Sequence, residues 1–145
     1  MKHLKLFVAL FAMLALGVGN AWAVKVTMTA GTNGSECTVN GINGIKVGTS
    51  KKGGDMTITV PAGATSLQLY AAAWKGVSGL SISITPESNV NPTSISLTAD
   101  DGISDSSPFT LTGVEESFKH EVTLSNITSE TKLTLTSSTT KRFVV

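Results

Sequence analysis

Short runs of alternating apolar and polar residues recur along this sequence and constrain its fold more than any other feature. In residues 56–60, Met56, Ile58 and Val60 alternate with threonines, and Pro61 ends the run. Successive side chains of a β-strand point to opposite faces, so a period of two is typical of a strand with one buried side. Comparable runs occupy residues 24–30, 66–74, 79–84, 93–98, 118–124 and 132–136.

Turn-forming residues separate these runs. Asn-Gly pairs begin at Asn33, Asn40 and Asn43, and this dipeptide favours the tight turn of a β-hairpin. About eight to ten short strands separated by turns predict an all-β fold, an antiparallel β-sandwich of the jelly-roll type. We expect residues 46–75 to form its centre, with strand 66–74 as the hairpin partner of strand 56–60.

Residues 1–23 have the pattern of a signal peptide. Lys2 and Lys5 precede an apolar run over residues 6–18, and Ala21-Trp22-Ala23 is the small-x-small pattern at which a signal peptidase cleaves. The apolar run is shorter than the roughly 20 residues that a helix needs to cross a bilayer. The sequence therefore predicts cleavage after Ala23, no membrane span afterwards, and export to the periplasm, the cell surface or the medium of a bacterium.

The remaining residues, 24–145, have the length of one β-sandwich domain. The pattern of residues 142–145 is that of a strand, and no turn or polar tail follows it. Three interpretations are open: a terminal strand that closes a sheet, a domain cut short of its natural C-terminal end, or an exposed strand that pairs with partner chains.

The charge balance argues against two classes of partner. The leader holds two of the 11 Lys and Arg residues and none of the ten Asp and Glu residues, so its removal changes the net charge from +1 to about −1. Nucleic acids and anionic membranes are bound by basic surfaces. Neither is expected as the main partner.

Residues 24–145 contain few of the residues that usually form a catalytic site. They contain one cysteine, Cys37, and one histidine, His120, which lies on the apolar side of its predicted strand. No motif pairs His120 with a nucleophile and an orienting acid. The glycine-rich loop 48–54 leads into a strand, whereas a phosphate-binding loop opens a helix. We expect a protein that is not an enzyme.

Three residues of strand 66–74 are the candidate ligand-binding residues. Gln68, Tyr70 and Trp74 fall on the side opposite the leucines of this strand if no bulge intervenes. The two aromatic residues then form either a second buried face or an exposed platform. An exposed platform would stack on the apolar faces of sugar rings, and Gln68 would bond their hydroxyl groups.

The loop 99–108 is the one acidic segment. Its Asp100, Asp101 and Asp105 supply carboxylate oxygens, which Ca²⁺ prefers as ligands, but they lack the regular spacing of a helix-loop-helix site. A solvated connection rich in turn residues is the alternative. No other cofactor is expected.

Residues 45–54, Ala72-Ala73-Trp74 and the closing residues 141–145 resemble a jelly-roll module of secreted bacterial proteins, which is itself similar to carbohydrate-binding modules. The resemblance implies a non-catalytic module that binds a glycan or another surface polymer. The alternative is a structural or assembly component of the bacterial surface that acts through its sheet edges and through residues 143–145.

Overall fold

The chain folds into antiparallel β-sheets, as expected. The computed structural model describes residues 12–16, 24–39, 42–74, 80–97, 119–137 and 142–145, and its only helix there is a short 3-10 turn, η1 (Glu87–Asn89). All strand pairs in these residues are antiparallel. None of the described residues belongs to a helix long and apolar enough to span a membrane.

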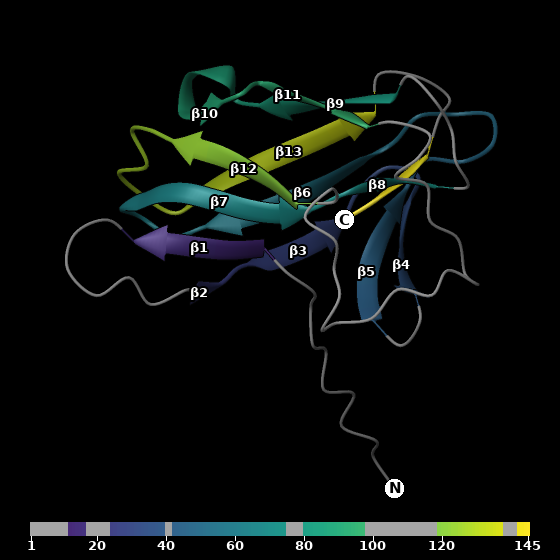
Figure 1. Ribbon diagram of the computed structural model, residues 1–145, viewed down its shortest axis with the longest axis horizontal. Coiled ribbons are helices and arrows are strands. Elements are labelled where there is room, and N and C mark those ends of the chain that lie inside the picture. The colour runs from purple at the N-terminus through teal and green to yellow at the C-terminus, as the bar shows by residue number, and fades with distance from the viewer. Residues whose placement is uncertain (1–11, 17–23, 40–41, 75–79, 98–118, 138–141) are drawn as a thin grey trace, which may run out of the picture.

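The strands form three sheets, which we number 1 to 3 (Figure 1). In spatial order, sheet 1 consists of β10 (Val90–Asn91), β12 (Lys119–Leu124), β7 (Ala64–Tyr70), β1 (Ala12–Leu16) and β2 (Val24–Lys25). Sheet 2 consists of β11 (Ser94–Leu97), β9 (Leu80–Thr85), β13 (Thr131–Ser137), β6 (Asp55–Val60) and β3 (Thr27–Ala30). Sheet 3 consists of β4 (Gly34–Val39), β5 (Ile42–Val47), β14 (Phe143–Val144) and β8 (Ala72–Ala73).

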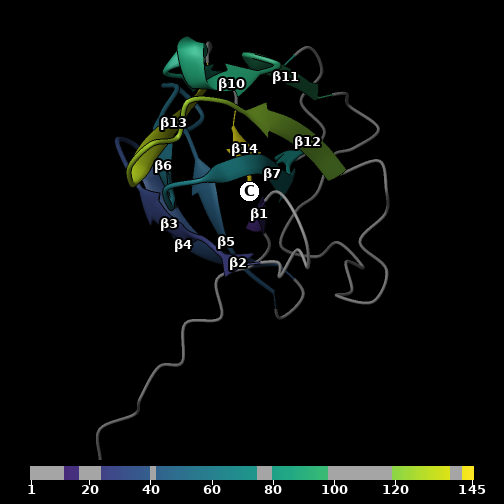
Figure 2. The same ribbon diagram turned by 90° about the vertical axis from the view of Figure 1, so that its left-hand side faces the viewer.

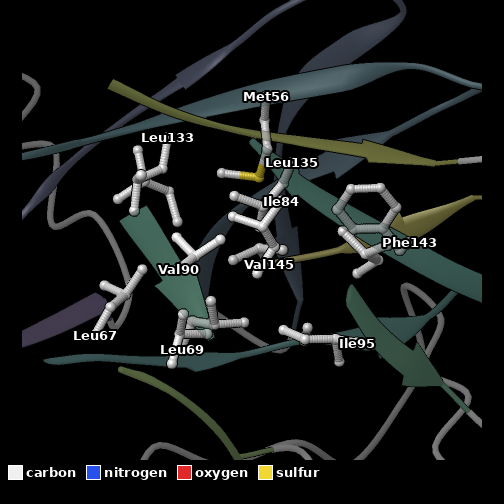
Figure 3. Packing of buried hydrophobic residues seen from close by; sticks show 14 of the residues in the cluster. Met56, Leu67, Leu69, Ile84, Val90, Ile95, Leu133, Leu135, Phe143 and Val145 are labelled. Atoms are coloured by element: carbon white, nitrogen blue, oxygen red, sulfur yellow. The ribbon is translucent and has the colours of Figure 1, made fainter. Parts of the chain in front are cut away.

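The strands surround a common interior (Figure 2), and the buried apolar side chains form one hydrophobic core there. Leu67 and Leu69 of β7 are fully buried and point towards the apolar residues of β6 and β13 (Figure 3). Buried and partly exposed residues alternate along all of β6. The alternation in the sequence thus identifies the faces of these strands correctly, because apolar side chains gain free energy when they leave water.

The predicted strand 24–30 is divided in two. Val26 is buried and lies between β2 and β3, which belong to sheets 1 and 2. The predicted hairpin of strands 56–60 and 66–74 is also wrong. Its first strand, β6, pairs with β13 and β3, whereas β7 pairs with β1 and β12. The turn at residues 61–63 therefore carries the chain from one sheet to the other.

The predicted strand 66–74 ends at Tyr70. Its continuation is β8 in sheet 3, and the intervening Ala71 is buried, as are both residues of β8. The alternation of faces cannot continue through a place where the chain changes sheets. Small alanine side chains allow this crossing because they fit between neighbouring strands without displacing the core.

The C-terminal residues form an interior strand. In sheet 3, β14 lies between β5 and β8, and Phe143 is opposite Val47 on one side and Ala73 on the other. The backbone N–H groups of Ile45 and Val145 each donate to the carbonyl oxygen of the other residue, over 2.8 and 3.0 Å. The interpretation of residues 143–145 as an exposed strand is therefore wrong.

A glycine is required where sheets 2 and 3 meet. Gly54 is buried, its carbonyl oxygen accepts a hydrogen bond from the N–H of Ser137, and a Cβ atom on it would lie 2.5 Å from the carbonyl oxygen of Thr32. We expect Gly54→Ala to lower the free energy of unfolding by about 1–3 kcal/mol, because backbone must move to relieve this overlap. Urea denaturation measures this difference.

Gly63→Ala is the comparison for Gly54→Ala. A Cβ atom on Gly63 meets nothing within 4 Å, but the residue has a φ of +83°. This left-handed conformation costs a residue with a side chain about 1–2 kcal/mol. A Gly54→Ala variant as stable as the unchanged protein would contradict the close approach at Thr32.

Candidate functional site

The outward row of β7 carries two of the three candidate ligand-binding residues. Gln68 and Tyr70 are half-buried, whereas Leu67 and Leu69, which alternate with them, have no exposed surface. The predicted separation of the leucines from Gln68 and Tyr70 is therefore confirmed. Because neighbouring strands hold the β7 backbone, these two side chains project from a fixed base.

The neighbouring strand β12 completes this surface. Lys119 lies opposite Tyr70, and Glu121 lies opposite Gln68. Gln68 Nε2 donates a hydrogen bond to Glu121 Oε1 over 3.3 Å, and Lys119 Nζ lies 3.8 Å from the same oxygen. We call these four residues, Gln68, Tyr70, Lys119 and Glu121, the β7–β12 face.

The chemistry of the β7–β12 face is that of a polar surface with one aromatic ring. Glu121 is exposed over 72% of its side chain and Lys119 over 26%, so their ion pair stands largely in water and contributes little to stability. An amide, a carboxylate and an ammonium group offer donors and acceptors to a polar ligand. Tyr70 places an aromatic ring at the end of this row.

Trp74 does not belong to this face. It is only 1% exposed, and its backbone N–H donates to the carbonyl oxygen of Arg142 over 2.9 Å. Lys46 Nζ lies 5.0 Å from the centre of the indole ring, within the range of a cation–π interaction. The expectation that Tyr70 and Trp74 share one face is therefore wrong, because the chain changes sheets between them.

Lys119 and Glu121 are absent from the residues predicted to bind a ligand. The sequence places both on the polar side of strand 118–124. Their position beside Gln68 and Tyr70 depends on the pairing of β7 with β12, two strands separated by about 50 residues. Alternation within one strand contains no information on this pairing.

The remaining candidate residues have less to offer. Cys37 is half-buried on β4, and His120 is half-buried opposite Leu69. The predicted calcium ligands Asp100, Asp101 and Asp105 lie outside the described residues. Within the part of the chain that the structure describes, no three His, Cys, Asp or Glu residues are grouped as a metal site would require.

Comparison with protein-family models, with curated proteins and with solved structures finds no match to this chain. The resemblance to carbohydrate-binding modules therefore stays a prediction.

Proposed function

We propose that the chain is an exported, non-catalytic binding module of the jelly-roll type that holds a glycan or another surface polymer on the β7–β12 face. One observation carries this proposal: the pairing of β7 with β12 puts Tyr70 opposite Lys119, in the same outward row as Gln68, which donates a hydrogen bond to Glu121. Sugars present both apolar C–H faces and hydroxyl groups. An aromatic ring beside polar side chains complements both.

The two strands also suit an extended ligand. Ser66, Gln68 and Tyr70 form the outward row of β7, and Thr123 and Glu121 are opposite the first two of them on β12. A polymer lying along these rows would meet a polar group at every second residue of each strand. The hydrogen bond from Gln68 to Glu121 orients both side chains before a ligand arrives, which reduces the entropy lost on binding.

Tyr70→Ala is expected to weaken glycan binding by about two- to thirteenfold, since stacking on an aromatic ring contributes about 0.5–1.5 kcal/mol. A glycan array identifies a retained polysaccharide, and affinity electrophoresis in gels containing it measures the dissociation constant of each variant. Tyr70→Phe keeps the ring and should retain most of the binding.

The matched control for Tyr70→Ala is Thr59→Ala. Thr59 lies on the outward side of β6 in sheet 2, and its exposure is also intermediate. This variant should bind as the unchanged protein does. Equal retardation of Tyr70→Ala and Thr59→Ala in the gel would show that the β7–β12 face does not bind the glycan.

A second candidate function is assembly with other chains through sheet edges. One observation favours it: β1, which pairs with β7, consists of residues 12–16 and therefore belongs to the predicted leader. Residues 143–145 do not support it, because β14 is paired on both sides.

A further inference from the structure

A segment of the predicted leader occupies a position inside sheet 1. β1 lies between β7 and β2 and runs antiparallel to β7. Three of its residues share register positions with inward-facing, buried residues of β7, in the pairs Ala12 with Leu69, Leu14 with Leu67 and Leu16 with Ala64. The position beside β7 thus accepts an extended segment with apolar residues at alternate places.

Cleavage after Ala23 would remove this segment from the chain. Among the strands that the structure describes, β7 would keep β12 as its one neighbour, and β2 would lose its one partner. Backbone N–H and C=O groups along one edge of β7 would then lose the partners that β1 supplies.

Three common protections of a sheet edge, namely a very short strand, charged residues and proline, are absent from β7, and its pairing with β1 has one irregularity, a register shift between Ala15 and Leu16. Natural edge strands carry charged residues or prolines, or they are very short. The seven residues of β7, Ala64–Tyr70, include neither a charge nor a proline. Such an edge is suited to the addition of a strand.

We propose that in the cleaved protein the β7 edge binds an extended strand of a second protein, antiparallel to β7, uncharged, and with apolar side chains at alternate positions. β1 shows the chemistry of this partner, because its residues 12–16 are uncharged and place Ala, Leu and Leu opposite the buried row of β7. The inference rests on the cleavage that the proposed function includes. It does not depend on the β7–β12 face binding a glycan.

The experiment uses the protein recovered after export by a bacterial host, with its N-terminus determined by mass spectrometry. The probe is a synthetic peptide with the sequence of residues 10–18 and a lysine tail beyond the pairing residues. We expect an N-terminus at Val24, saturable peptide binding, and amide hydrogen exchange in β7 slowed about tenfold or more by the peptide. The full 145-residue chain, which carries β1, should not bind the peptide.

Three altered peptides identify the mode of binding. Exchanging Leu14 with Ala15 puts the two leucines side by side, so no register can bury both, and binding should weaken about tenfold or more. In an antiparallel pair, alternate residues direct their N–H groups towards one neighbouring strand. N-methylation of residues 13 and 15 and N-methylation of residues 14 and 16 should therefore differ. The set whose N–H groups face β7 should abolish binding, and the set whose N–H groups face β2, which pairs with only two residues of β1, should weaken it far less.

Several outcomes would overturn the inference. One is an exported protein that still contains residues 12–16, and another is a failure of the peptide to bind. A third is hydrogen exchange in β7 that is as slow without peptide as the exchange in β6. The fourth is equal binding of the two N-methylated peptides. Protection without peptide would mean that another segment of the same chain fills the position. The glycan proposal fails separately, through unchanged binding of Tyr70→Ala, so the two results can be told apart.

Discussion

Trp74→Ala is expected to lower the free energy of unfolding by about 3–5 kcal/mol, the usual cost of truncating a large buried aromatic side chain. The indole is 1% exposed, and the residue joins β8 to the segment before β14 through the bond from its N–H to the Arg142 carbonyl oxygen. Removal of the ring leaves a cavity in closely packed surroundings. Guanidinium denaturation followed by circular dichroism measures the change.

Two variants separate the contributions at Trp74. Lys46→Met removes the ammonium group that lies 5.0 Å from the ring centre and should cost only about 0.5–2 kcal/mol. Trp74→Phe keeps an aromatic ring of smaller volume and should fall between Lys46→Met and Trp74→Ala. An unfolding midpoint for Trp74→Ala equal to that of the unchanged protein would contradict the burial of this side chain.

Phe143→Ala is expected to have an effect of the same size, about 3–5 kcal/mol. The ring is fully buried and lies in the core beside Val145 (Figure 3). β14 also supplies the pairing that links β5 to β8, so the loss of this anchor loosens sheet 3 as a whole. Denaturant unfolding gives the change in stability, and hydrogen exchange at Ile45 and Trp74 reports the loosening.

Phe143→Leu is the matched control, because leucine preserves most of the apolar volume and should cost less than about 1.5 kcal/mol. Arg142→Ala changes a half-buried neighbour and leaves its backbone carbonyl oxygen in place as the acceptor for Trp74. If Phe143→Ala were no more harmful than Arg142→Ala, β14 would not be an interior strand.

The positions and faces of most strands are predictable from the sequence. The alternation at residues 56–60 and 132–136 corresponds to β6 and β13, and Leu133 and Leu135 are fully buried as their positions indicate. Burial of apolar side chains enforces this pattern locally, since a shift of one residue would turn the whole apolar row towards water.

The pairing of strands is much less predictable. β6 and β7 are close in sequence and have equally regular patterns, yet they pair with β13 and β12 instead of with one another. Alternation specifies which side of a strand is buried but not which strand lies beside it. The alternation does not reveal the changes of sheet at Val26 and Ala71. Both residues are apolar and buried, as residues within a continuous strand could also be.

The candidate site illustrates the same limit. The alternation within strand 66–74 is enough to predict Gln68 and Tyr70 as candidate residues. Lys119 and Glu121 lie beside them only because β7 pairs with β12. Trp74 is an amphipathic residue that suits both a core and a binding platform. The sequence leaves its burial open beside an exposed platform and a bulge or loop position, and the choice among them depends on the position of β8 in sheet 3.

The burial of Trp74 away from the β7–β12 face is tested most directly by acrylamide quenching of Trp74 fluorescence. In a Trp22→Phe variant, Trp74 is the one remaining tryptophan whether or not the leader is cleaved. The burial of the indole predicts a quenching constant that is a small fraction of that of free N-acetyltryptophanamide. Quenching as efficient as that of the free compound would place Trp74 on the surface and contradict this arrangement of core and binding face.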